Sequence, residues 1–358
     1  MTGFKAHLTS PRAIGIVCAL SATLLGLVYL QVAGAPTSHL IVNSLSLAMG
    51  LGLFSAIPQS APKSRAWGGV VLALGSMLLA TAMFGVSVDG ASRWVRVSGV
   101  SLQISLIVLP PMLVLFARAG GLLATAGVAL AALGLALQPD RAMAGILAAA
   151  LAVLVLYRQE RQFVLTLAAA GVGFVVTLLR PDSLPAVPYV DRILYTSFEV
   201  HPLAGIAVWG GALLLIVPGL AGLWMDSANR SAHAVFGVVW FGMVVAAALG
   251  NYPTPLVGYG GSAILGYALS LSCMPMKARC AAVATALSPN PTQTDTTRAR
   301  TSECVLSSDH VLWSTCTRQE PNERMKADRL AVQSGGRPPM SRQCHGLLRL
   351  DGPAAYPK

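Results

Sequence analysis

Long apolar stretches recur along this 358-residue chain and restrict the folds that it can adopt. A helix that crosses a bilayer needs about 20 mostly apolar residues. Only 11% of the residues are charged, whereas a soluble domain carries about a quarter, so a water-soluble fold is excluded. Ten runs have cores at Ala13–Val32, Leu40–Phe54, Gly68–Phe84, Val100–Phe116, Leu122–Leu137, Met143–Leu156, Val164–Leu179, Leu203–Leu223, Val235–Leu249 and Ser262–Cys273.

These runs predict an all-α polytopic membrane protein of about ten transmembrane helices, formed by residues 1–275. Residues 276–358 are rich in Ser, Thr, Pro, Arg and Gln without a sustained apolar period, which predicts a disordered cytoplasmic tail. The first run is followed by Ala33–Ala35, which mimics a signal-peptidase site. Pro36 comes directly afterwards and the run is long, so we interpret it as an uncleaved anchor.

The distribution of basic residues predicts the orientation, because Lys and Arg prefer cytoplasmic loops. With the N-terminus inside, ten basic residues lie on the cytoplasmic side and five in outer loops. Both termini are therefore predicted to be cytoplasmic. The formal net charge of +11 is explained by this loop bias, and we expect no nucleic-acid partner. The outer set is Arg93, Arg96, Arg141, Arg180 and Arg192.

Cysteine spacing gives no metal site. Cys18 and Cys273 fall in apolar runs, where a packing role is expected. The remaining cysteines lie in the tail and lack the paired C-x-x-C spacing of a zinc site, so no metal ligand is assigned.

Four segments on the predicted outer side go beyond generic membrane composition. Asp89–Val95 reads D-G-A-S-R-W-V and is followed by Gln103-Ile104-Ser105 at the start of the fourth run. Leu137–Asp140 reads L-Q-P-D, and Pro255–Ser262 reads P-L-V-G-Y-G-G-S. In the loop between runs seven and eight, Leu184-Pro185 precedes Asp191, and Glu199 lies eight residues further on.

In their order along the chain and in their positions between the apolar runs, the segments resemble motifs of the SEDS family of peptidoglycan polymerases, the FtsW/RodA/SpoVE-like proteins. The family motifs read N-G-A-x-R-W, Q-P-S-E, L-Q-P-D, L-P-E-A-H-T-D and P-F-x-S-Y-G-G-S. The resemblance implies a SEDS-like fold in the bacterial cytoplasmic (inner) membrane, with the active face outward. It covers about Ala13 to Cys273 and leaves out the tail.

The resemblance also implies a chemistry. Such enzymes transfer a growing strand from undecaprenyl diphosphate to the 4-hydroxyl of lipid II, in cell division or cell-shape maintenance. Asp191 matches the catalytic carboxylate if one residue is inserted after Leu184-Pro185, with Asp182 as a nearby alternative. Substrate binding falls on Arg93, Trp94, Arg96, Gln103, Arg192 and Glu199, and structural roles on Gln138, Pro139, Asp140, Tyr259, Gly260, Gly261 and Ser262. Mg²⁺ or another divalent cation is the implied cofactor, and a class B penicillin-binding protein and membrane lipids are implied partners.

Simpler roles compete with these assignments. Trp94 is equally expected as an interfacial anchor, and Arg93 and Arg96 as ligands of lipid phosphates. Gly258–Ser262 fits a tight helix entry, and Gln138 and Asp140 fit helix caps.

The chain also departs from the family pattern. Leu106 and Leu109 occupy the positions of a family Glu and Lys, which indicates a lost ion pair or a changed substrate site. Tyr189 replaces the His two residues before the catalytic Asp, and Gly258 replaces the Ser of S-Y-G-G-S.

Three functions follow from the sequence. The first is a divergent glycosyltransferase that polymerises lipid II. The second is a non-catalytic scaffold or a lipid-linked precursor transporter (flippase) of the same fold. The third is a potassium channel, since Val257–Gly260 matches the core of the T-V-G-Y-G filter, but the preceding Asn251–Pro255 segment is a poor pore helix.

Overall fold

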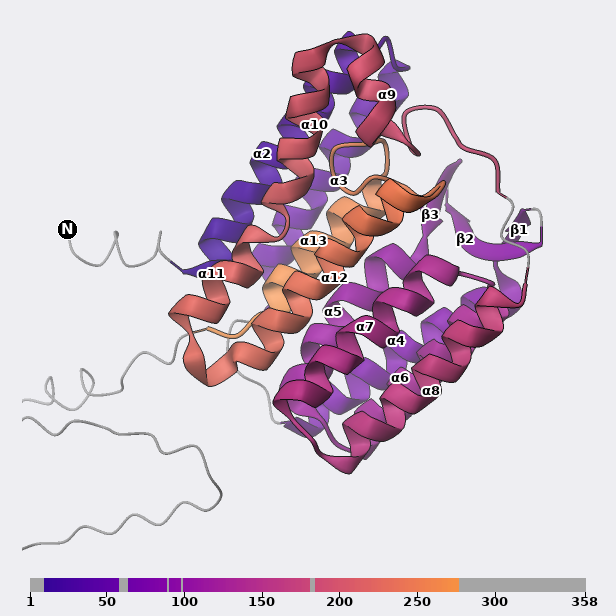
Figure 1. Ribbon diagram of the computed structural model, residues 1–358, viewed down its shortest axis with the longest axis vertical. Coiled ribbons are helices and arrows are strands. Elements are labelled where there is room, and N and C mark those ends of the chain that lie inside the picture. Colours follow the sequence, from indigo (N-terminus) through magenta and orange to yellow (C-terminus); the bar gives the residue numbers. More distant parts are fainter. Residues whose placement is uncertain (1–9, 58–63, 89, 98, 181–183, 277–358) are drawn as a thin grey trace, which may run out of the picture. The chain divides into compact units, whose positions relative to one another are not determined.

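The computed structural model describes residues 10–57, 64–88, 90–97, 99–180 and 184–276. The predicted tail lies outside these residues, as do Asp89 and Asp182. The described part is a bundle of apolar helices with a small sheet at one end (Figure 1). We call this end the sheet end, and the end where α5 meets α6 the opposite end.

All ten predicted runs correspond to helices, which confirms a polytopic membrane fold. Within the described residues, six helical segments are long and apolar enough to cross a membrane, and four apolar helices are shorter. The long segments contain α2 (Pro11–Val32), α3 (Thr37–Ala56), α4 (Ser64–Phe84), α8 (Arg161–Leu178), α10 (Pro202–Leu214) with α11 (Val217–Met225), and η1 (Ser227–Asn229) with α12 (Arg230–Leu249). The shorter helices are α5 (Ile104–Ala119), α6 (Leu122–Leu137), α7 (Arg141–Tyr157) and α13 (Gly261–Cys273).

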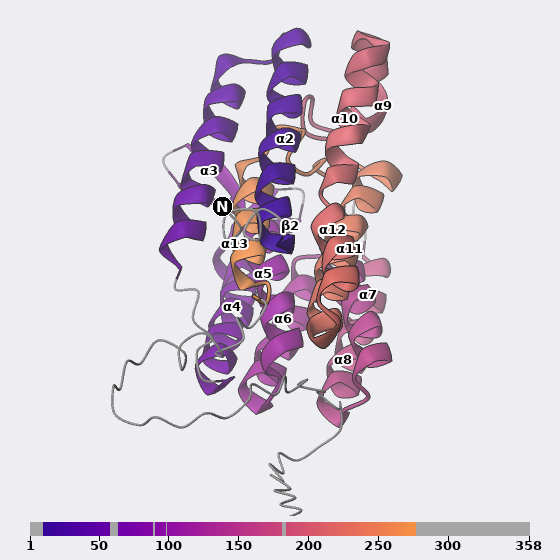
Figure 2. The same cartoon turned by 90° about the vertical axis from the view of Figure 1, so that its left-hand side faces the viewer.

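Helix α13 lies at the centre of the bundle and packs on α3 and α5 (Figure 1). Nearly all its residues are buried, and Tyr267 contacts the Trp240 ring of α12 edge-on at 4.7 Å. Helix α2 lies between α3 and α10 (Figure 2). Because lipid is as apolar as a leucine side chain, close contact of small residues drives helix association in membranes.

The fourth run is partly wrong as a helix. Val100–Gln103 is strand β3, and α5 begins only at Ile104. The strand pairs antiparallel with β2 (Ala91–Val97), which pairs in turn with β1 (Val86–Val88). The apolar residues that lengthened the predicted helix therefore belong to a hairpin.

The eighth run is also interrupted, because α10 ends at Leu214 and α11 begins at Val217. Pro218 is the second residue of α11 and has no backbone N–H to donate into the preceding turn. A short helix that was not predicted, α9 (Ile193–Val200), precedes α10.

Candidate functional site

Strand β2 carries the first motif and alternates its side chains as a strand must. Arg93 is buried and only 2% exposed, whereas Arg96, three residues further along the strand, is exposed and Trp94 is half-buried. Trp94 pairs with Gln103 of β3 across the ladder. Of the two arginines, only Arg96 is open to a ligand at the surface in this conformation.

Arg93 joins the first motif to the second. Its Nε donates to the Gln138 carbonyl at 3.4 Å, and its Nη2 donates to the Pro139 carbonyl. The Gln138 side chain in turn donates to the Leu78 carbonyl of α4 at 2.8 Å. A buried guanidinium is tolerable only when its donors are satisfied, so Arg93 fixes the α6–α7 turn against the sheet.

A second chain of hydrogen bonds connects three motifs through Gln103. The Gln103 backbone N–H donates to Ser262 Oγ at 3.0 Å, and its side chain donates to Ser105 Oγ at 3.2 Å. Ser105 donates to Asp140 Oδ2 at 3.0 Å, and Asp140 Oδ1 accepts from the Met143 amide as the N-cap of α7. Segments far apart in sequence thus meet in one buried network.

Asp191 lies in the loop before α9, outside the spanning helices. The residue is 9% exposed, and its Oδ2 accepts from the Val187 amide at 2.8 Å. Within the described part of the chain, no other group donates to this carboxylate, so Oδ1 has no protein donor. Burial raises the pKa of the Asp191 carboxyl above its ordinary value, and the bond from Val187 opposes this shift only in part.

The loop before α13 pairs with the Asp191 loop through its backbone. Asp191 and Pro253 form an antiparallel bridge, and the Thr254 N–H donates to the Val190 carbonyl at 3.0 Å. The Arg93 guanidinium lies over the Tyr252 ring, 5.9 Å from its centroid. Asp191 and Arg93 therefore approach adjacent residues of one short segment, although the sequence separates them widely.

The remaining predicted site residues of the Asp191 loop are at the surface. Arg192 is exposed and adopts a left-handed backbone conformation with φ 60°, and Glu199 is exposed on α9. No described contact joins Glu199 to Asp191.

The departures from the family pattern have a structural counterpart. Leu106 and Leu109 are buried in the apolar core of α5, and the Leu106 carbonyl lies 2.0 Å from where a Cβ on Gly266 would be. A Cβ on Gly258 would lie 2.9 Å from the Thr254 carbonyl oxygen, so a serine at this position would force the loop to shift. Gly258 is thus required by close packing.

Asn43 and His39 of α3 were missed as site residues, although both contact the 258–260 segment. A polar Asn in the middle of an apolar run is a signal that the sequence already contained. Tyr252 was also missed, and no sequence pattern pointed to it.

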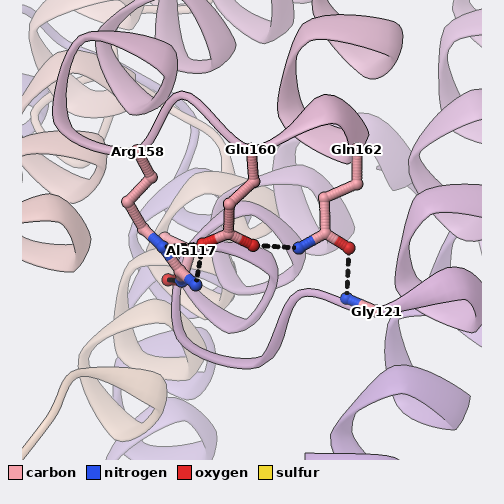
Figure 3. A network of polar contacts seen from close by, with 5 residues as sticks. All are labelled: Ala117, Gly121, Arg158, Glu160 and Gln162. Atoms are coloured by element: carbon pink, nitrogen blue, oxygen red, sulfur yellow. Dashed lines mark hydrogen bonds and ion pairs between the residues drawn. The ribbon is translucent and has the colours of Figure 1, made fainter. Parts of the chain in front are cut away.

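The polar network at the opposite end has an ordinary loop role. Arg158 is paired with Glu160 at 2.5 Å, and Gln162 links Glu160 to the Gly121 amide (Figure 3). The Arg158 and Glu160 side chains are 33% and 48% exposed, so water screens the pair and its stabilisation is small. This network connects two loops.

The described residues contain no group of three or more His, Cys, Asp or Glu side chains that would hold a metal ion. Mg²⁺ is usually held by one or two carboxylates together with substrate phosphates, so a divalent cation stays a prediction here.

No protein-family model matches the sequence, and no curated protein matches it significantly. The crystal structure of the rod shape determining protein RodA of Thermus thermophilus matches the fold with a TM-score of 0.51 and 20% identity, over 72% of this chain and 93% of RodA. An aspartate-to-alanine mutant of the same RodA matches with a TM-score of 0.51 and 21% identity, over 72% and 94% of the two chains. The predicted SEDS-like, polytopic fold is therefore confirmed.

Proposed function

We propose that this chain is a divergent SEDS-type glycosyltransferase that polymerises a lipid-linked cell-wall precursor. The observation that supports the proposal most is the environment of Asp191. This carboxylate is buried outside the spanning helices, no described residue donates to its second oxygen, and its pKa is raised. A base with a raised pKa accepts a proton more readily at neutral pH than an ordinary aspartate does.

In the proposed step, Asp191 Oδ1 takes the proton of the 4-hydroxyl of an incoming lipid II sugar. The hydroxyl oxygen forms a bond to the anomeric carbon of the growing strand while the bond from that carbon to undecaprenyl diphosphate breaks. The leaving diphosphate carries the electron pair away. Arg96 and Arg192 are exposed cations at the sheet end. They are the proposed contacts for the phosphate oxygens of the leaving diphosphate.

The proposal includes a location and partners. The protein lies in the bacterial cytoplasmic membrane with both termini in the cytoplasm and the sheet end outward, as the loop charges predict. Its partners are the undecaprenyl-linked substrate, membrane lipids and a class B penicillin-binding protein.

Polymerisation of labelled lipid II by the purified full chain tests the proposal. We expect polymer from the wild type and a loss of about 10²–10⁴-fold in Asp191→Asn, the usual contribution of a general base. Glu160→Gln removes an exposed carboxylate at the opposite end and is the matched control, with activity unchanged. Equal activity of Asp191→Asn and the wild type would refute the role of Asp191.

A non-catalytic scaffold or lipid-linked precursor transporter is the second candidate function. It is favoured by Leu106 and Leu109, which fill the apolar core where the family has an acid and a base. If this function is correct, a cell-wall phenotype caused by deletion is rescued equally well by the wild type and by Asp191→Ala. Co-purification of a penicillin-binding protein with both variants would favour the scaffold.

The potassium-filter alternative has little support. The Gly258 carbonyl, which a filter would need for ion coordination, accepts a hydrogen bond from Asn43 at 2.9 Å. Potassium flux into liposomes that contain the protein would support a channel function.

A further inference from the structure

One face of α3 presents polar and small side chains to the protein interior, although the helix is otherwise apolar. His39, Asn43, Ser46 and Gly50 follow the spacing of one helical face. Asn43 is fully buried, and Ser46 is 7% exposed. A polar amide inside a membrane protein is costly unless both its ends are satisfied, so the partners of Asn43 indicate its role.

The Asn43 side chain binds the backbone on both sides of Tyr259. Its Nδ2 donates to the Gly258 carbonyl at 2.9 Å, and its Oδ1 accepts from the Gly260 N–H at 3.1 Å. The side-chain amide thereby satisfies one backbone carbonyl and one backbone N–H of this irregular segment, as a neighbouring strand would in a sheet. Both hydrogen-bonding ends of Asn43 are used for this single contact.

His39, one turn earlier on α3, holds the side chain of the same residue. Its ring stacks on Tyr259 with centroids 3.8 Å apart and an interplanar angle of 14°. It also meets Tyr189 edge-on at 5.9 Å. Helix α3 therefore contacts both the 258–260 segment and the loop that carries Asp191.

The contact continues to Asp191 through backbone hydrogen bonds. The Tyr259 N–H donates to the Tyr189 carbonyl at 2.7 Å, two residues before Asp191. The Thr254 N–H donates to the Val190 carbonyl, and Pro253 bridges to Asp191 itself. The segment that is hydrogen-bonded to Asn43, a contact that we call the Asn43 clamp, is thus itself adjacent to residues 189–191 through backbone contacts.

We propose that Asn43 is a positioning residue that holds the Asp191 loop in place through the 258–260 segment. It does not touch substrate and acts through Tyr259. Its effect on turnover rests on the proposed function, whereas its effect on the two loops does not.

Hydrogen exchange of the full chain in detergent tests the contact without any assumption about activity. Asn43→Leu keeps a side chain of similar volume but removes the hydrogen-bond partners of the Gly258 carbonyl and the Gly260 N–H. We expect the amides of Thr254, Tyr259 and Gly260 to exchange at least about tenfold faster, since their hydrogen bonds depend on the clamp. Ser44→Leu is the control, because Ser44 is the exposed neighbour of Asn43 on the same helix.

The kinetic arm uses lipid II polymerisation by the same variants. A misplaced base lowers kcat with little change in KM, and we expect a loss of about tenfold or more in Asn43→Leu. Asn43→Asp keeps the acceptor for Gly260 but places a carboxylate oxygen beside the Gly258 carbonyl, so its loss in kcat is expected to be at least as large as that of Asn43→Leu. A fall in kcat that is confined to these two variants supports positioning.

Two results would overturn the proposal: unchanged exchange of all three amides in Asn43→Leu, or faster exchange with an unchanged kcat in an active enzyme. If the wild type forms no polymer, the proposed function fails instead. The exchange arm then still decides whether Asn43 holds the loop.

Discussion

Asp191 combines two properties that oppose each other in a folded protein. Its burial disfavours the charged carboxylate and raises the pKa of this group, while a general base has to be charged to work. Because the folded state binds this proton more tightly than the unfolded chain, the contribution of Asp191 to stability is present at low pH. It is lost as pH rises through the raised pKa.

The first prediction concerns the pH dependence of kcat/KM. A base works deprotonated, so the rate falls as pH drops through the pKa of Asp191, and we expect this acid limb above the ordinary aspartate range. Rates with lipid II across the acid range measure it. A limb at an ordinary carboxyl pKa would contradict the assigned environment.

The second prediction concerns stability at the same residue. Asp191→Asn keeps an acceptor for the Val187 amide and removes the buried charge. We expect a higher Tm than the wild type at neutral pH, and a difference that shrinks as pH falls through the raised pKa of the carboxyl. Thermal unfolding in detergent at several pH values measures both. A lower Tm at neutral pH would show that the carboxylate is stabilised by its surroundings.

The third prediction separates a structural from a substrate role of Arg93. Arg93→Met leaves the carbonyls of Gln138 and Pro139 without these donors, at a cost of about 2–5 kcal/mol in unfolding free energy. Arg96→Met changes an exposed side chain and should stay within about 0.5 kcal/mol. Denaturation of both variants in detergent measures the difference. An unchanged stability of Arg93→Met with a raised KM would instead assign Arg93 to the substrate.

At the scale of elements, glycines set how closely helices approach. A Cβ on Gly127 of α6 would lie 2.4 Å from the Val71 carbonyl oxygen of α4, and one on Gly75 would lie 1.9 Å from the Gly127 carbonyl oxygen. Neither backbone atom can move aside as a flexible side chain would. The α4–α6 contact therefore depends on both glycines.

The fourth prediction tests this contact. Gly127→Ala should lower the unfolding free energy by about 1–3 kcal/mol, because the added methyl group forces the two helices apart. Gly171→Ala on α8 is the matched control, since no atom lies within 4 Å of its Cβ position and alanine favours a helix. Equal effects of both variants on thermal unfolding would refute the close approach.

Most elements were predictable from the sequence because each spanning helix has to be apolar along its own length. The exceptions are local. Val100–Gln103 reads V-S-L-Q, an apolar–polar alternation typical of a strand, but four residues joined to a long apolar run were assigned to the helix. The break before α11 was predictable from Pro218, whereas strand β1 is only three residues long and gave no period.

For the whole molecule, the sequence indicated which motifs to examine but not the contacts that their residues make. The motifs identified Asp191, Arg93 and Gln103 as residues on one side of the membrane. Periodicity does not say which helices touch, so the burial of Arg93 and the clamp from Asn43 to Gly258 were not predictable. Both depend on contacts between segments that are distant in sequence.

The fifth prediction concerns orientation in the membrane. In a background without other cysteines, Arg96→Cys at the sheet end should react with a membrane-impermeant thiol reagent in intact cells. Glu160→Cys at the opposite end should react only after permeabilisation, because the proposed orientation has that end in the cytoplasm. The reverse pattern would invert the predicted topology.

The clamp between Asn43 and Gly258 also has a consequence for biogenesis, because 215 residues separate the two partners. Helix α3 leaves the ribosome long before the segment that satisfies its amide has been translated. A polar group without partners is costly in the bilayer, so this face of α3 is disfavoured in lipid until the 258–260 segment packs against it. The Asp191 loop can form its hydrogen bonds with residues 253–259 only after that segment has been translated.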